Sequence, residues 1–109
     1  MPLIAVYGSL RRRKCLHDHY MKSATFLGKD WIEGFELWVG EWPYAVKGEG
    51  RIKVEVYEVC EETFEEINKM EVESGYIPTK VKTKFGIAVL WEYPRRRGRK
   101  IESGDINDQ

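Results

Sequence analysis

The 109-residue sequence lacks the features of membrane, secreted and disulfide-stabilised proteins. No apolar run approaches the roughly 20 residues that a membrane-spanning helix needs. Residues 1–8 contain neither a basic segment nor a long apolar segment, so we expect no signal peptide. The only cysteines, Cys15 and Cys60, form no Cys-x-x-Cys pair, and the first interpretation is two small buried side chains. Such sparse cysteine favours a cytoplasmic protein without membrane association.

The sequence also has no net charge, because its 18 lysine and arginine residues balance its 18 aspartate and glutamate residues. This balance argues against a protein held to nucleic acid by bulk electrostatics. Asparagine and glutamine total three, whereas glutamate and lysine are abundant, a bias typical of thermophile proteins. Hydrophobic residues make up 42% and aromatic residues 13%, which excludes intrinsic disorder. We expect a single domain, residues 1–109, with one core.

The balanced total hides two basic blocks, residues 11–14 and residues 95–100. A small barrel with basic loops and aromatic side chains could bind single-stranded nucleic acid, so a non-catalytic module for nucleic acid or a small ligand is the competing hypothesis. No base-reading motif is visible, which argues against nucleic acid. The tryptophans lie in strand patterns and are interpreted as core residues: Trp31, Trp38, Trp42 and Trp91.

Short strands dominate the predicted secondary structure, giving an α+β fold built on a small barrel or strongly bent sheet. Residues 51–59 form the clearest strand, because apolar and charged side chains alternate there. Turns are expected at residues 48–50 and 94–98, where glycine or proline interrupts the pattern. The remaining predicted strands are residues 3–6, 24–27, 31–39, 42–46, 81–85 and 87–93, with a short closing piece at 101–106.

One helix is clearly predicted, beginning at the capping-box spacing Thr63-x-x-Glu66. At about 100° per residue, Glu71 falls between Phe64 and Ile67 on the apolar side, if the helix runs that far. Burial would raise the pKa of such a carboxyl group toward the range of a general base. The alternative is a helix that ends near Met70, with Glu71 turned outward. The other 17 acidic residues suit surface positions.

The segment Tyr7-Gly8-Ser9-Leu10 directly follows the first predicted strand. Gly8 allows a sharp turn and a close approach of a ligand to the backbone. Successive amides that leave such a turn can form a small anion-binding concavity. The alternative is an ordinary strand end with a Gly-Ser turn.

Four segments in order resemble the gamma-glutamylcyclotransferase-like proteins. They are the opening Val-Tyr-Gly-Ser-Leu at residues 6–10, the central strands at 34–59, the helix and tyrosine at 67–81, and the final hairpin at 88–105. The resemblance implies a small mixed β-barrel flanked by short helices. It also implies a small-molecule gamma-glutamyl substrate that is converted to 5-oxoproline and a free amine, in a cyclising acyl-transfer or lyase reaction.

The resemblance assigns roles to particular residues. Glu71 corresponds in position to the family's catalytic glutamate, which takes a proton from the substrate α-amine. Tyr7, Gly8, Ser9 and Leu10 would form the substrate loop, and Tyr76 would line the pocket or serve packing. The reaction implies no metal and no organic cofactor. Three residues depart from the family pattern: Asn68 where aspartate is usual, and Val72 and Arg13 where glycine is frequent.

Two other constellations carry weaker signals. His17-Asp18-His19 could suggest a metal site, but two histidines one residue apart share a face only on a strand and need a further ligand. Cys15 lies beside basic residues that could lower its pKa, yet no Cys-His spacing specifies a partner for a nucleophile. We therefore expect no metal site.

Overall fold

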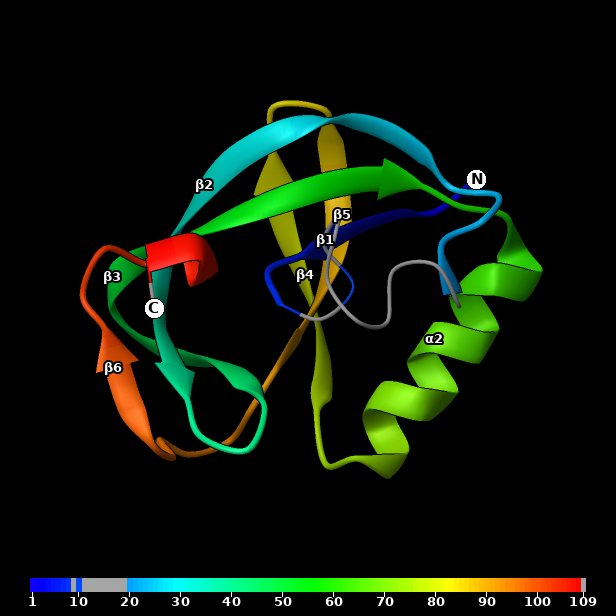
Figure 1. The fold of residues 1–109 in the computed structure, drawn as a ribbon. Helices are drawn as coiled ribbons and strands as arrows, with labels where there is room; N and C mark the ends of the chain where they lie inside the picture. Colours follow the sequence, from blue (N-terminus) through cyan, green and yellow to red (C-terminus); the bar gives the residue numbers. More distant parts are fainter. Residues whose placement is uncertain (9, 11–19, 109) are drawn as a thin grey trace.

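The computed structural model describes residues 1–8, 10 and 20–108, which form a mixed six-stranded sheet curled into a half-barrel (Figure 1). The strand order is β4-β5-β1-β3-β2-β6; β1 runs parallel to β5, and the other neighbours are antiparallel. The expected α+β fold is confirmed. The elements are β1 Leu3–Val6, β2 Thr25–Val39, β3 Pro43–Glu58, α2 Glu61–Glu73, β4 Ile77–Thr83, β5 Gly86–Glu92, β6 Arg99–Ile101 and the 3-10 helix η1 Ile106–Asp108.

The long hairpin of β2 and β3 corrects the predicted short strands. Residues 24–27 and 31–39 belong to one bent strand, and residues 48–50 continue β3 instead of forming a turn. The pairing shifts register between Phe26 and Gly28 and again between Glu33 and Phe35. Bulges of this kind bend a strand and increase its twist without ending it. Gly28 and Gly34 lie at these register shifts, where the strand bends and continues.

Both faces of the central strands are buried, which explains why β1 is a continuous apolar run. Ala5 and Tyr7 point into the concave side of the sheet, where Leu37, Val54 and Leu90 are also buried. Ile4 and Val6 point to the opposite face. There α2 packs through buried Ile67 against a second cluster that includes Tyr57, Val59 and Trp91.

The helix α2 begins earlier than the predicted capping box and extends far enough to include Glu71. Its N-cap is Cys60, not Thr63, and the Cys60 Sγ accepts a hydrogen bond from the Thr63 N–H at 3.4 Å. Cys60 is thus a half-buried helix cap, not a buried core residue. The helix continues past Met70 to Glu73, where Ser74 caps it, so Glu71 lies in the last helical turn. The alternative of an earlier helix end is wrong.

Two acidic residues on the strands correct the expectation that every acid except Glu71 is at the surface. Glu55 and Glu92 are 4% and 6% exposed. Glu55 accepts a hydrogen bond from the Tyr57 hydroxyl at 2.9 Å, and Glu92 accepts one from Thr79 at 2.6 Å and lies 3.8 Å from the Lys47 ammonium. These partners offset the cost of removing the carboxylates from water. In the described part of the chain, no helix is long and apolar enough to cross a membrane.

The packing of α2 can be tested by truncating its buried side chain. Ile67 is fully buried between α2 and the sheet, so Ile67→Ala should lower the free energy of unfolding by about 2–5 kcal/mol. Val72 is on the same helix and 48% exposed, so Val72→Ala should change it by less than about 0.5 kcal/mol. Guanidinium denaturation of the three proteins measures both effects. Equal destabilisation by the two variants would contradict this packing.

Candidate active site

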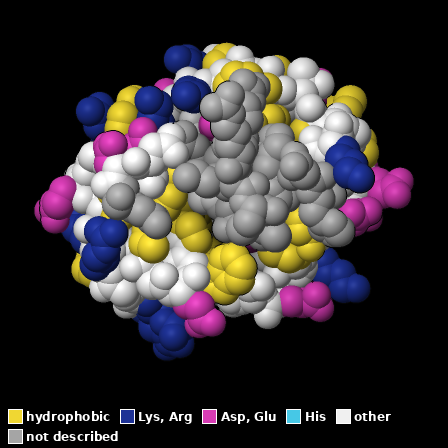
Figure 2. All heavy atoms as spheres, in the orientation of Figure 1, with side chains coloured by type: hydrophobic (Ala, Val, Ile, Leu, Met, Phe, Trp, Pro, Cys, Tyr) yellow, Lys and Arg dark blue, Asp and Glu magenta, His cyan; other side chains and the backbone are white. Residues whose placement is uncertain are grey.

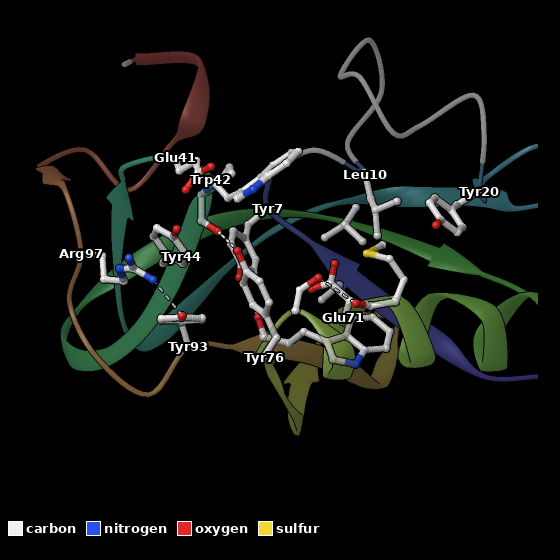
Figure 3. Close-up of a pocket in the computed structure, with 17 residues that line it drawn as sticks. Tyr7, Leu10, Tyr20, Glu41, Trp42, Tyr44, Glu71, Tyr76, Tyr93 and Arg97 are labelled. Carbon is white, nitrogen blue, oxygen red and sulfur yellow. Dashed lines mark hydrogen bonds between the residues drawn. The ribbon is translucent and has the colours of Figure 1, made fainter.

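A pocket of about 420 Å³ opens where four chain segments meet (Figure 3). The segments are the end of β1, the β2–β3 connection, the last turn of α2 with the start of β4, and the chain from Trp91 to Arg97; Tyr20 adds to the lining from before β2. Apolar and aromatic side chains supply most of the wall. The ionisable side chains among its lining residues are Tyr7, Tyr20, Glu41, Tyr44, Glu71, Tyr76, Tyr93 and Arg97.

The end of β1 supplies the predicted substrate loop. Tyr7, Gly8 and Leu10 line the pocket, whereas Ser9 lies outside the described residues. The buried Tyr7 hydroxyl donates a 2.6 Å hydrogen bond to the carbonyl of Trp91. A Cβ atom at Gly8 would lie 2.8 Å from the Pro43 ring, so Pro43 must approach a residue without a side chain. Gly8 is thus required by a close contact between chain segments.

Glu71 reaches the pocket from the last turn of α2. No Lys or Arg of the described chain has a nitrogen within 4.0 Å of its carboxylate. Burial without a cationic partner raises the pKa of Glu71 to about 7. This carboxyl group can therefore both accept and donate a proton near neutral pH, which is the property of a general acid–base.

Three tyrosines form a connected aromatic wall beside Glu71. Tyr44 packs against Tyr93 and Tyr76, with ring centroids 4.5 Å and 5.9 Å apart, and Tyr76 meets Tyr93 at 5.1 Å. The Tyr76 hydroxyl donates a 2.7 Å hydrogen bond to the Pro43 carbonyl. Burial, and next the negative charge of Glu71, raise the pKa of Tyr76 above its ordinary value, so its phenol stays neutral. Tyr76 thus lines the pocket and packs in its wall, and the two alternatives are compatible.

Sequence reasoning missed Trp42, Glu41 and Arg97, which also line the pocket. Trp42 was expected in the core but is 47% exposed, because it lies in the connection between β2 and β3. Of the tryptophans, Trp91 is the one buried as predicted; Trp31 and Trp38 are half-buried. Arg97 is one of five basic residues within residues 95–100, and the sequence does not distinguish it from the others. In the structure, Arg97 donates a hydrogen bond to the Tyr93 hydroxyl at 3.2 Å.

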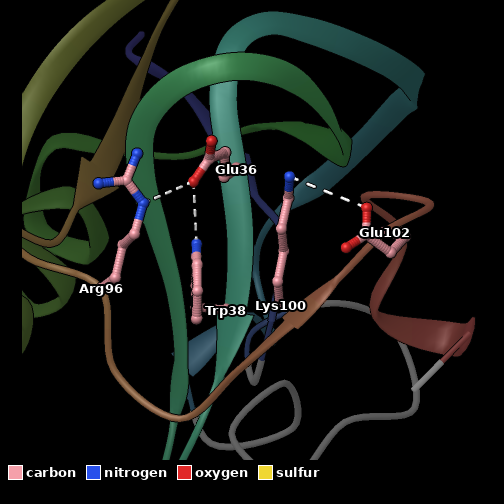
Figure 4. Close-up of polar contacts among 5 residues, drawn as sticks. All are labelled: Glu36, Trp38, Arg96, Lys100 and Glu102. Carbon is pink, nitrogen blue, oxygen red and sulfur yellow. Dashed lines mark hydrogen bonds and ion pairs between the residues drawn. The ribbon is translucent and has the colours of Figure 1, made fainter.

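The second basic block does not act as one surface. Arg96 bonds Glu36 at 2.8 Å, Trp38 donates to the same oxygen at 3.1 Å, and Lys100 pairs with Glu102 (Figure 4). The Arg96 bond lowers the pKa of Glu36 to about 2. On the face in Figure 2, the described cations alternate with acidic side chains. The first basic block, with Arg13, lies outside the described residues, as do Cys15 and His17-Asp18-His19.

The structure describes two of the three residues that depart from the family pattern, Asn68 and Val72. Asn68, one turn before Glu71, accepts a 2.9 Å hydrogen bond from the indole N–H of Trp91 and so fixes a pocket-lining side chain. Val72 is exposed and does not line the pocket. No group of three His, Cys, Asp or Glu side chains suited to a metal ion occurs within residues 1–8, 10 and 20–108.

A family model described as "Gamma-glutamyl cyclotransferase, AIG2-like" matches residues 4–108. The chain belongs to this family. This gamma-glutamyl cyclotransferase family member is 57% identical over 106 residues to the protein PH0828 of Pyrococcus horikoshii, covering 96% of the chain and 90% of the relative. It is 36% identical over 110 residues to YtfP of Escherichia coli K12, named a gamma-glutamylcyclotransferase family protein, with 97% and 96% covered.

Solved structures agree with this membership. The crystal structure of PH0828 superimposes with a TM-score of 0.94 at 55% identity, over 99% of this chain and 92% of that one. The solution structure of Escherichia coli YtfP gives a TM-score of 0.78 at 34% identity, over 98% and 99% of the two chains. The expected fold and family are therefore confirmed, and the half-barrel is the common fold of these relatives.

The raised pKa of Glu71 makes folding stability depend on pH. Because the folded pKa of about 7 exceeds the ordinary 4.5, the native state binds the proton more tightly, and stability falls as pH rises between these values. The free energy of unfolding should fall by about 3 kcal/mol between pH 4.5 and 8, relative to Glu71→Gln. Guanidinium denaturation at several pH values measures this difference. The matched control is Glu73→Gln, because Glu73 is exposed. If the free energy of unfolding depends on pH in the same way for the wild type and Glu71→Gln, the raised pKa of Glu71 is refuted.

Proposed function

We propose that this protein cyclises a gamma-glutamyl amide to 5-oxoproline and releases the amine, with Glu71 as the general base. Family membership supports the class of reaction. The observation that carries the proposal is a carboxyl group with a pKa of about 7 on the wall of a pocket that Tyr7, Gly8 and Leu10 also line. A buried, unpaired carboxylate destabilises a protein, and a role in proton transfer accounts for its presence.

The reaction exchanges one amide bond for another. The substrate's α-amine is normally an ammonium, so the Glu71 carboxylate first accepts a proton from it. The free amine then attacks the γ-carbonyl carbon and closes a five-membered ring through a tetrahedral intermediate. Attack leaves one extra proton on the ring nitrogen. Glu71 returns the first proton to the departing nitrogen as the original C–N bond breaks, and then passes the second proton from the ring nitrogen to the released amine, which leaves as an ammonium. Atoms and charge balance within the substrate, and Glu71 ends in its starting state.

The remaining pocket residues suit binding and orientation. Backbone N–H groups of Gly8, Ser9 and Leu10 would bind the substrate carboxylate or the oxygen that gains negative charge. Burial raises the pKa of Tyr7 well above its ordinary value, as it does for Tyr76. Both phenols therefore stay protonated at neutral pH and do not compete with Glu71 as a base. We assign them to shaping the pocket around the glutamyl group.

The proposal predicts that the purified protein releases 5-oxoproline from gamma-glutamyl amino acids or amines, measured by liquid chromatography. Glu71→Gln should lower kcat/KM by about 100-fold or more, because an amide cannot accept the proton. The wild-type kcat/KM should rise with pH through about 7, as Glu71 ionises.

Glu73→Gln is again the control and should keep wild-type rates, since Glu73 is exposed and outside the pocket. Equal rates for wild type and Glu71→Gln across the substrate panel would contradict the role of Glu71. Ligand binding without turnover by the wild type would instead indicate the non-catalytic binding module.

A further inference from the structure

Arg97 gives the pocket a cationic end that the cyclisation mechanism does not use. Among the described lining residues it is the one Lys or Arg. Arg97 Nη1 donates to the Tyr93 hydroxyl at 3.2 Å, and the guanidinium carbon lies 5.9 Å and 6.0 Å from the rings of Tyr44 and Tyr93. The exposed Arg97 side chain thus lies beside the aromatic wall.

Within the described chain, the Arg97 guanidinium makes one hydrogen bond, to Tyr93, so most of its N–H donors are available to a ligand. A guanidinium has five N–H donors and matches a carboxylate in a two-bond arrangement. No described carboxylate lies within 4.0 Å of Arg97; Glu41, exposed on the same wall, interacts with it only at longer range. The neighbouring Arg96, in contrast, is paired with Glu36 at 2.8 Å outside the pocket lining.

Glu71 and Arg97 lie on either side of the tyrosine wall, with Tyr76 between them (Figure 3). The pKa of Tyr76 responds to both charges: Glu71 raises it and Arg97 lowers it. Glu71, Tyr76 and Arg97 all line the same pocket, so a single ligand can contact both charged groups. A cation and a carboxyl group at separate positions define a direction for that ligand.

Ring closure decides which part of the substrate lies at each end. The glutamyl α-amine must meet Glu71 and the γ-carbon together, so the compact glutamyl group, with its own carboxylate, stays beside Glu71, Tyr7 and Gly8. The leaving amine extends from the γ-carbonyl away from that group, along the tyrosines. We infer that Arg97 binds a carboxylate on the leaving amine, so that gamma-glutamyl amino acids are preferred over gamma-glutamyl amines that lack the carboxylate.

This inference rests on the proposed function, and a matched pair of substrates tests it. Gamma-glutamyl-alanine and gamma-glutamyl-ethylamine differ in the leaving group only by one carboxylate. We expect wild-type kcat/KM to favour the alanine amide by about 10-fold, the contribution of one charge-assisted contact at a partly solvated site. In Arg97→Met, the ratio of kcat/KM for gamma-glutamyl-alanine to that for gamma-glutamyl-ethylamine should fall close to one, because only the reaction of gamma-glutamyl-alanine is slowed.

Arg95→Met is the control, because Arg95 is an exposed cation two residues away that does not line the pocket; it should keep the wild-type ratio. An unchanged ratio in Arg97→Met would overturn the inference, as would an equal loss for both substrates, which would place Arg97 at the glutamyl group. Either result leaves 5-oxoproline release, and hence the proposed function, intact.

A binding measurement separates the inference from turnover. Calorimetric titration of Glu71→Gln and Glu71→Gln/Arg97→Met with each amide compares affinities without chemistry. A preference for the alanine amide that disappears with Arg97→Met supports the inference even if no 5-oxoproline is released by the wild type, in which case the proposed function alone fails. Equal affinity of Glu71→Gln for the two amides overturns it.

Discussion

The close contact of Pro43 with Gly8 is the constraint on which the pocket depends. It joins the end of β1 to the start of β3 at a distance that no residue with a side chain would permit at position 8. The Pro43 carbonyl also accepts a hydrogen bond from the Tyr76 hydroxyl, which connects the chain just before β4 to Pro43. Tyr76 contacts Tyr93, and Tyr93 bonds Arg97. The contact between Gly8 and the Pro43 ring is therefore connected, through Tyr76 and Tyr93, to the aromatic wall and to Arg97.

The acidic residues that are removed from water differ in whether a hydrogen-bond donor or a cation accompanies them. Glu55 and Glu92 lie on strands and are held by tyrosine, threonine or lysine groups. Glu71 faces the pocket from a helix whose neighbouring turn is fixed by Ile67 in the apolar cluster. Since its pKa is raised by burial, its ionised form destabilises the folded protein at neutral pH. The stability of the fold and the proton transfer proposed for Glu71 therefore place opposite demands on this position.

Features with a regular period could be predicted from the sequence, and features made by contacts between distant segments could not. The helical period placed Glu71 beside Ile67, and the structure extends α2 far enough to keep it there. Strand lengths were wrong because a glycine bulge and a glycine turn look alike until the partner strand is known. Trp42 was assigned to the core because its neighbours suggested a strand, while its actual place depends on where β2 and β3 join.

Arg96 and Arg97 show why charge cannot be interpreted from composition in this chain. The two residues are adjacent in a basic run, yet Arg96 is paired with Glu36 and Arg97 faces the pocket. The zero net charge counts both in the same way. A salt bridge closed within the protein leaves nothing for a ligand, whereas Glu71 and Arg97 each line the cavity without an oppositely charged partner within 4.0 Å in the described chain. Under the roles proposed for Glu71 and Arg97, a substrate with an ammonium at one end and a carboxylate at the other would contact both groups, and the positions of the two charges, not their sum, would determine which ligand is preferred.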